Sequence, residues 1–289
     1  MRVSFRIILA ALSLSAAVAE TGQDYAASIA RWRADREARL KAENGWLTVA
    51  GLHWLKEGEN SVGSGADARI TLPAAAPKLV GVITLQNGRT RFTPKGNIVY
   101  KGAPLTSPID LRPDTEPNYD VLTVGRINFY VIKRDYKIGI RVKDNDNPAR
   151  KQFAGLQWYP VDASWKIRAK FTPWDKPRKL SFDTEVGVKE EDESAGVVTF
   201  IKNGKEYKME AVKDGDGLWF VMRDATSGKS TYGASRFLYT DAPKNGFVDL
   251  DFNRAENPPC AFTPFATCPL PPPQNRLTLA VTAGELYKH

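Results

Sequence analysis

Residues 249–253, DLDFN, place two carboxylates and an amide at alternate positions. The stretch begins like a D-x-D-x-N calcium loop, but Arg254 and Cys260 stand where such a loop needs glycine and glutamate, which excludes an EF-hand. Folded as a strand, it puts Asp249, Asp251 and Asn253 on one face. Asp249 and Asp251 are therefore candidate acid or base groups of an enzyme without a nucleophilic triad. The alternative is the solvated side of a sheet.

Arginine and aromatic side chains accompany these acids in two parts of the chain: the carboxy-terminal block and the segment DNPARKQFAGLQWYPVD at residues 146–162. A guanidinium group binds a carboxylate through two parallel hydrogen bonds, whether that carboxylate belongs to a ligand or to the protein itself. A ligand site and an internal ion-pair network are both compatible with this pattern. The candidate ligand-binding residues are Arg150, Trp158, Tyr159, Arg236, Arg254, Asn257 and Arg276.

Conventional nucleophilic and phosphate chemistry lacks its required residues. The two histidines are His53, inside an apolar run, and His289 at the end of the chain, whereas a serine triad needs an oriented base. Residues 233–237, GASRF, lack the final glycine of a nucleophile elbow. Arg223 stands where a Walker loop ending in SGKST would have its first glycine, and no dinucleotide fingerprint follows a strand. We expect no metal and no cofactor.

The segment NPPCAFTPFATCPLPPPQNRL, residues 257–277, contains both cysteines of the chain and is rich in proline. Two cysteines eight positions apart in an exported protein predict a disulfide between Cys260 and Cys268. The bridge and the prolines would hold irregular backbone in one shape. Such a tail either seals the edge of a sheet or presents a rigid polar rim.

Residues 1–19 have the pattern of a secretory signal peptide, with two arginines, a short apolar run and Ala17-Val18-Ala19 before the expected cleavage site. We therefore expect an exported protein, periplasmic or extracellular, without a membrane span after the signal is removed. The formal net charge is +8, but Lys and Arg alternate with acids along the chain, so nucleic acid is not an expected partner. No pattern indicates an oligomeric state.

The elements that must position these residues are mainly strands. Residues 20–45 predict one amphipathic helix with Tyr25, Ile29, Trp32 and Leu40 on its apolar stripe. From residue 46 onward, short apolar or alternating runs separated by turn residues predict sandwiches or barrels, and the two Lys-Asn-Gly sequences predict hairpins. We expect a mainly β protein of two packed sandwich-like or barrel-like lobes, residues 46–147 and 148–289, and a solvated loop at the acidic run 189–193.

Four blocks resemble, in order, an exported bacterial family catalogued as domain of unknown function 1684: WLTVAGLHWLKEGENSVGSG, DNPARKQFAGLQWYPVD, YGASRFLYTDAP and VDLDFNRAENPPCAFTPFATCPLPPPQNRL. The resemblance covers nearly all of the chain after residue 19 and implies no activity. Residues 51–73 also look like the opening of a forkhead-associated (FHA) sandwich, a domain that binds phosphothreonine. Ser64 replaces the arginine that this family has after the glycine matched by Gly63, so the likeness extends to the fold and not to phosphopeptide binding.

Three classes of function follow. The leading hypothesis is a non-catalytic binding module that takes a small anionic or carbohydrate-like ligand in a cleft between the lobes, with Arg150, Arg236 and Arg254 as anchors. The second is a lyase or glycan hydrolase that uses Asp249 or Asp251. The third is a structural or scaffold protein of the envelope.

Overall fold

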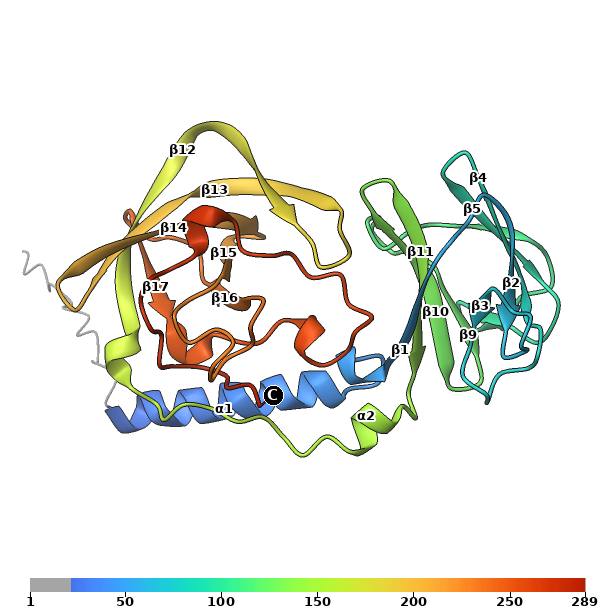
Figure 1. Cartoon of the computed structure of the whole chain (residues 1–289), viewed down its shortest axis with the longest axis horizontal. Coiled ribbons are helices and arrows are strands. Elements are labelled where there is room, and N and C mark those ends of the chain that lie inside the picture. Colours follow the sequence, from blue (N-terminus) through green and yellow to red (C-terminus); the bar gives the residue numbers. More distant parts are fainter. Residues whose placement is uncertain (1–21, 289) are drawn as a thin grey trace, which may run out of the picture.

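The computed structural model describes residues 22–288, so the expected signal peptide at residues 1–19 lies outside the described residues. Over residues 22–288 the protein is mainly β, as the sequence predicts, with three sheets and one long helix (Figure 1). Within residues 22–288, no helix is long and apolar enough to cross a membrane.

Helix α1, Gly22–Lys41, precedes the first lobe in sequence but packs on the second (Figure 1). Tyr25 and Ile29 are buried, and the hydroxyl of Tyr25 donates to the Asp251 carboxylate over 2.7 Å. The helix ends before Asn44, which adopts a left-handed conformation with a φ of 59°. A side chain at Gly45 would lie 2.6 Å from the carbonyl oxygen of Leu40, so only glycine fits there. The Asn-Gly stop predicted from the sequence is confirmed.

The first lobe is a sandwich of two sheets that bury a shared apolar core. One sheet has the order β1-β11-β10-β9-β6-β7 and the other β3-β2-β4-β5-β8. Phe92 and Phe129 meet edge to face between the two sheets, with ring centroids 5.9 Å apart. After a 3-10 turn, Trp46–Thr48, the strands are β1 Val49–Trp54, β2 Gly58–Gly63, β3 Ile70–Thr71, β4 Gly81–Gln86, β5 Arg89–Pro94, β6 Val99–Tyr100, β7 Ala103–Pro104, β8 Ile109–Leu111, β9 Val121–Val124, β10 Ile127–Arg134 and β11 Lys137–Asp144.

The second lobe is one strongly curved sheet with the order β16-β15-β14-β13-β12-β17. Its longest strands, β12 and β13, arch over the carboxy-terminal tail (Figure 1). The pairing register shifts at Gly196, where a side chain would lie 2.3 Å from the carbonyl oxygen of Thr172. The elements are helix α2 Pro148–Lys151, a 3-10 turn Ala163–Trp165, β12 Lys166–Asp183, β13 Lys189–Lys202, β14 Lys205–Asp214, β15 Gly217–Met222, β16 Arg236–Thr240, β17 Phe247–Asp251, and 3-10 turns Phe252–Arg254, Pro259–Ala261 and Pro273–Asn275.

The two Lys-Asn-Gly sequences have different outcomes. Asn203 and Gly204, with φ angles of 52° and 73°, form the tight turn between β13 and β14, so that hairpin is confirmed. Asn245 and Gly246 make a similar turn, but the strands on either side, β16 and β17, lie at opposite edges of the sheet. β17 pairs with β12 instead, which buries Leu250 in the core. The second hairpin prediction is therefore wrong beyond the turn itself.

The carboxy-terminal tail fills the concave side of the curved sheet and is fixed to it by side chains as well as by backbone. Val281 and Ala283 are fully buried. Asn275 accepts a hydrogen bond from the backbone N–H of Glu210 and donates to the carbonyl oxygens of Glu210 and Val221. The predicted disulfide between Cys260 and Cys268 is present, with their Cα atoms 6.2 Å apart. The tail thus acts as core and edge cover for this lobe.

Candidate functional site

The two aspartates singled out in the sequence differ in environment. Asp249 is exposed, whereas Asp251 is buried and accepts hydrogen bonds from the hydroxyl of Tyr25 and the backbone N–H of Asn253. Asp251 also lies 3.3 Å from the guanidinium of Arg254. The side chain of Asp251 is therefore held by protein groups, and that of Asp249 faces solvent.

The three arginines expected to anchor a ligand do not come together. Arg236 is completely buried, and its guanidinium contacts the Asp224 carboxylate at 3.1 Å and tail carbonyl groups. Arg150 donates to the carbonyl oxygens of Lys41 and Asn145, which ties α2 to the end of α1. Of the three, only Arg254 lines a surface hollow.

The other candidates also hold the fold together. The ring of Trp158 meets Trp32 edge to face at 5.5 Å. Tyr159 shares a hydrogen bond with the hydroxyl of Ser230. Asn257 is buried, and its amide nitrogen donates to the carbonyl oxygen of Leu286. The exposed Arg276 donates to the carbonyl oxygen of Pro271.

A cleft of about 820 Å³ lies where the two lobes meet. The first lobe contributes Thr115, the end of β10 at Lys133 and Arg134, and Asp135 in the turn that follows. The opposite wall comes from β12, the start of β13, and the tail around the disulfide, including Thr267 and Cys268. The location agrees with the expected cleft between lobes, although other residues line it.

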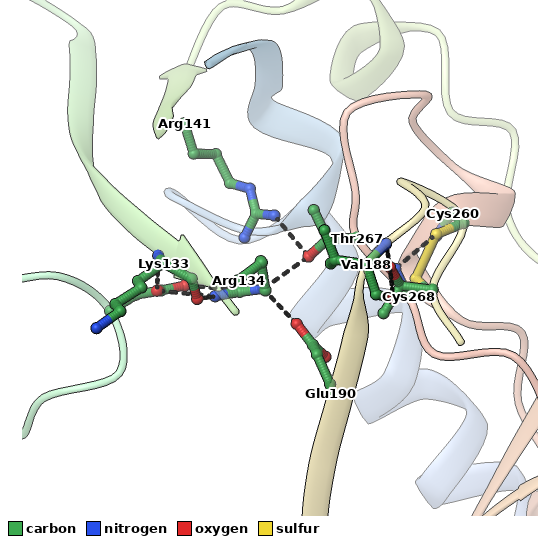
Figure 2. Close-up of polar contacts among 10 residues, drawn as sticks. Lys133, Arg134, Arg141, Val188, Glu190, Cys260, Thr267 and Cys268 are labelled. Atoms are coloured by element: carbon green, nitrogen blue, oxygen red, sulfur yellow. Dashed lines mark hydrogen bonds and ion pairs between the residues drawn. A yellow bond between two sulfur atoms is a disulfide. The ribbon is translucent and has the colours of Figure 1, made fainter. Parts of the chain in front are cut away.

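Arg134 fixes the distance between the two walls. Its guanidinium donates two hydrogen bonds to the Asp114 carboxylate within the first lobe, at 2.9 and 2.8 Å. It also reaches the second lobe, where its Nε lies 2.9 Å from the Thr267 hydroxyl and 3.1 Å from the Glu190 carboxylate (Figure 2). Arg141 donates to the same Thr267 hydroxyl, next to the disulfide at Cys268 (Figure 2).

Aromatic rings form one side of the cleft because strand alternation places them on one face. Phe237 and Tyr239 are two residues apart on β16, and Trp219 is their neighbour on β15. The Trp219 and Tyr239 rings are stacked, with an interplanar angle of 9° and centroids 6.2 Å apart. Tyr239 is 45% exposed. Trp46 also lines the cleft, so the wall offers flat apolar surface beside polar groups.

Partly buried carboxylates form a second feature of the cleft wall, and the fully buried Glu285 lies behind one of them, Glu256. Nε of Arg36 lies 3.2 Å from the Glu256 carboxylate and 3.4 Å from that of Glu285. Burial raises the pKa of Glu256, although Arg36 opposes this effect. Burial also raises the pKa of Glu285 to about 7, and Arg36 again opposes the rise while Glu256 adds to it. Within the cleft, burial raises the pKa of Glu190 as well.

A second hollow of about 530 Å³ adjoins the cleft and shares Tyr239 and Glu256 with it. Its other groups include Asp249, Asp251 and Arg254 from the carboxy-terminal block and Trp32 from α1. The shared Glu256 is held in place by its backbone, which exchanges two hydrogen bonds with Phe237 at 2.8 and 2.9 Å. Asp249, Asp251 and Arg254 are thus brought together beside the main cleft.

Sequence reasoning missed most of the residues that line the cleft, among them Arg134, Trp219 and Tyr239, and it misassigned the acidic run 189–193. That run is the first part of strand β13 and not a solvated loop, because it pairs with residues 179–183 of β12. The four consecutive acids after Lys189 gave no alternating signal in the sequence, and it is the strand that places Glu190 and Asp192 on one face. Both line the cleft. Among residues 22–288, no group of acidic, histidine or cysteine side chains could hold a metal ion.

Three solved structures that match this chain cover only part of it, with TM-scores of 0.40 or less. An uncharacterized protein of Haloarcula marismortui, solved by NMR, is 28% identical over 47% of this chain and 78% of that chain, with a TM-score of 0.40. An FHA domain studied for phosphothreonine-dependent interactions is 19% identical over 32% of this chain and 92% of that chain, with a TM-score of 0.23. EmbR of Mycobacterium tuberculosis, in complex with a low affinity phosphopeptide, is 14% identical over 40% of this chain and 30% of that chain, with a TM-score of 0.22.

None of the curated proteins matches this chain. The family match covers the second lobe and its tail, which is narrower than the resemblance seen in the sequence. Residues 151–286 match the family described as "Protein of unknown function (DUF1684)", which confirms the family resemblance for this part of the chain.

Proposed function

We propose that the cleft between the lobes binds a carbohydrate-like ligand with many hydroxyl groups and no net charge. The observation that carries the proposal is the stacked Trp219 and Tyr239 pair, with Tyr239 half-exposed, at the side of a cleft that also contains carboxylate, guanidinium and ammonium groups. Sugar rings present C–H faces that pack on aromatic rings, and hydroxyl groups that hydrogen-bond to charged side chains.

The charge of the cleft favours a neutral ligand over an anionic one. Its lining contains five acids and four bases, a formal balance of −1. Arg134 is already bound to Asp114 and Glu190, and Arg36 to Glu256, so these ion pairs engage two of the four bases and two of the five acids of the lining. An anion would meet more carboxylates than free cations, whereas a hydroxyl group can donate to the former and accept from the latter.

The test is a glycan array probed with the mature protein, followed by calorimetric titration of the glycans that bind. Tyr239→Ala removes the exposed half of the aromatic pair and should weaken binding about tenfold, since such a contact contributes roughly 1 to 1.5 kcal/mol. The matched control is Tyr119→Ala, because Tyr119 is 39% exposed and lines neither hollow. A mature protein that binds no glycan on the array would contradict the proposal.

Glu256 supports a second candidate, an enzyme that cleaves the bound glycan. This carboxylate lies where the two hollows meet, and burial raises its pKa, as a general acid requires. Glu256 would give its proton to the leaving glycosidic oxygen, while another carboxylate of the cleft lining takes a proton from the water that attacks the anomeric carbon. If so, glycans incubated with the protein gain reducing ends, and Glu256→Gln keeps binding while losing this turnover. Binding without new reducing ends would contradict the enzyme hypothesis and support a binding module.

A further inference from the structure

The two hollows have the same kind of lining. Each contains aromatic side chains, Trp219 in the cleft and Trp32 in the second hollow, with Tyr239 between them. The second hollow has four acids and three bases, again a balance of −1, as in the cleft. A ligand that extends from one hollow to the other would therefore meet similar chemistry twice.

The border between the hollows is rigid. Tyr239 belongs to β16, which pairs with β15, and the backbone of Glu256 is bound on both sides to Phe237. Trp32 is supported by the ring of Trp158 at 5.5 Å. Because these groups are fixed before any ligand arrives, binding across the border orders few protein side chains.

Each hollow alone has a volume in the range of single small-molecule sites, about 300 to 1,000 Å³. Their shared border makes them two parts of one longer surface. From this geometry and the repeated lining, we propose that the ligand is a linear oligosaccharide or polysaccharide, with successive sugar units in the cleft, over Tyr239 and in the hollow beside Asp249. This inference rests on the proposed carbohydrate binding and specifies its ligand as a chain.

Titration calorimetry with linear oligosaccharides of one to six units tests the inference, using the cello-, xylo-, chito- and malto-series. In the series that binds, affinity should rise at least tenfold between the single sugar and the longest member. Asp249→Ala should lower the affinity for the longest member at least fivefold. It should change the affinity for the single sugar less than twofold. Of the two hollows, Asp249 lines only the second. Because its side chain is exposed, the variant should fold normally.

The matched control is Asp216→Ala, which removes an exposed aspartate that lines neither hollow. It should change no affinity. Tyr239→Ala should weaken both short and long members, since Tyr239 borders both hollows. Equal affinity for the single sugar and the longest member would overturn the chain inference and leave carbohydrate binding intact. A gain with length that Asp249→Ala does not reduce would also overturn it, and no binding in any series would overturn both proposals.

Discussion

Replacing Glu285 by glutamine should change the pH dependence of folding stability. The Glu285 side chain is fully buried, and one of its carboxylate oxygens, Oε1, has no hydrogen-bond partner among residues 22–288. Burial raises its pKa from 4.5 to about 7 in the folded protein. Between pH 4.5 and about 7, the folded state therefore keeps a proton on the Glu285 carboxyl that the unfolded state has lost. The corresponding stability is fully present below pH 4.5 and is lost as the pH rises through 7.

The magnitude follows from the pKa values. A change of one in a pKa between the unfolded and folded states corresponds to ~1.36 kcal/mol of stability. The rise of the Glu285 pKa from 4.5 to about 7 therefore corresponds to about 3 kcal/mol. Glutamine imitates the protonated side chain at every pH, and Arg36 keeps Glu256 as its partner. Glu285→Gln should therefore differ from the wild type by less than about 1 kcal/mol at pH 5 and be more stable by about 3 kcal/mol at pH 8.

Urea unfolding followed by tryptophan fluorescence at pH 5, 6, 7 and 8 measures this difference. The control is Glu206→Gln, at a side chain that is 58% exposed, and it should follow the wild type at each pH. If the stability difference between Glu285→Gln and the wild type were the same at pH 5 and pH 8, the carboxyl of Glu285 would titrate normally. The assignment of the buried carboxyl as a proton-binding group would then be wrong.

Three further experiments test contacts that hold the second lobe together and join it to the first. Replacing Cys260 and Cys268 by serine should lower the free energy of unfolding by about 2.5 kcal/mol, the chain-entropy value for a loop of this length, as measured by urea unfolding. Arg134→Gln should cost about 3 kcal/mol and increase the radius of gyration in small-angle X-ray scattering, because the contacts of Arg134 with Thr267 and Glu190 in the other lobe are lost. Arg236→Met should cost about 3 to 5 kcal/mol because it leaves Asp224 buried and unpaired, and adding Asp224→Asn should restore part of the loss in thermal unfolding.

The sequence predicts the elements of this protein better than it predicts their contacts. Strand alternation, the Asn-Gly turn at Asn203 and the stop at Asn44 are local properties, and the structure confirms them. The disulfide could be predicted because two cysteines permit one pairing. The place of α1 could not be predicted, since a helix before the first lobe can pack on either lobe with the same apolar stripe.

The candidate site shows the same limit for arginine. The sequence does not distinguish the buried Arg236, which pairs with Asp224, from the half-buried Arg134, which lies between the two lobes. Their difference comes from partners distant in sequence, such as Thr267 for Arg134, 133 positions away. Residue type predicts that an arginine will find an acceptor, but the fold decides whether that acceptor leaves the guanidinium facing a cleft.

The cleft depends on segments from both ends of the described chain. Arg36 of α1 binds Glu256, and the same guanidinium binds Glu285 near the carboxy-terminal end. A second nitrogen of this guanidinium, Nη2, donates to the carbonyl oxygen of Asn257 over 2.8 Å. Because this one side chain holds the carboxylate at the border of both hollows, the shape of the binding surface is coupled to the docking of the helix. A ligand that binds only the folded arrangement would therefore stabilise the docking of α1 together with the cleft.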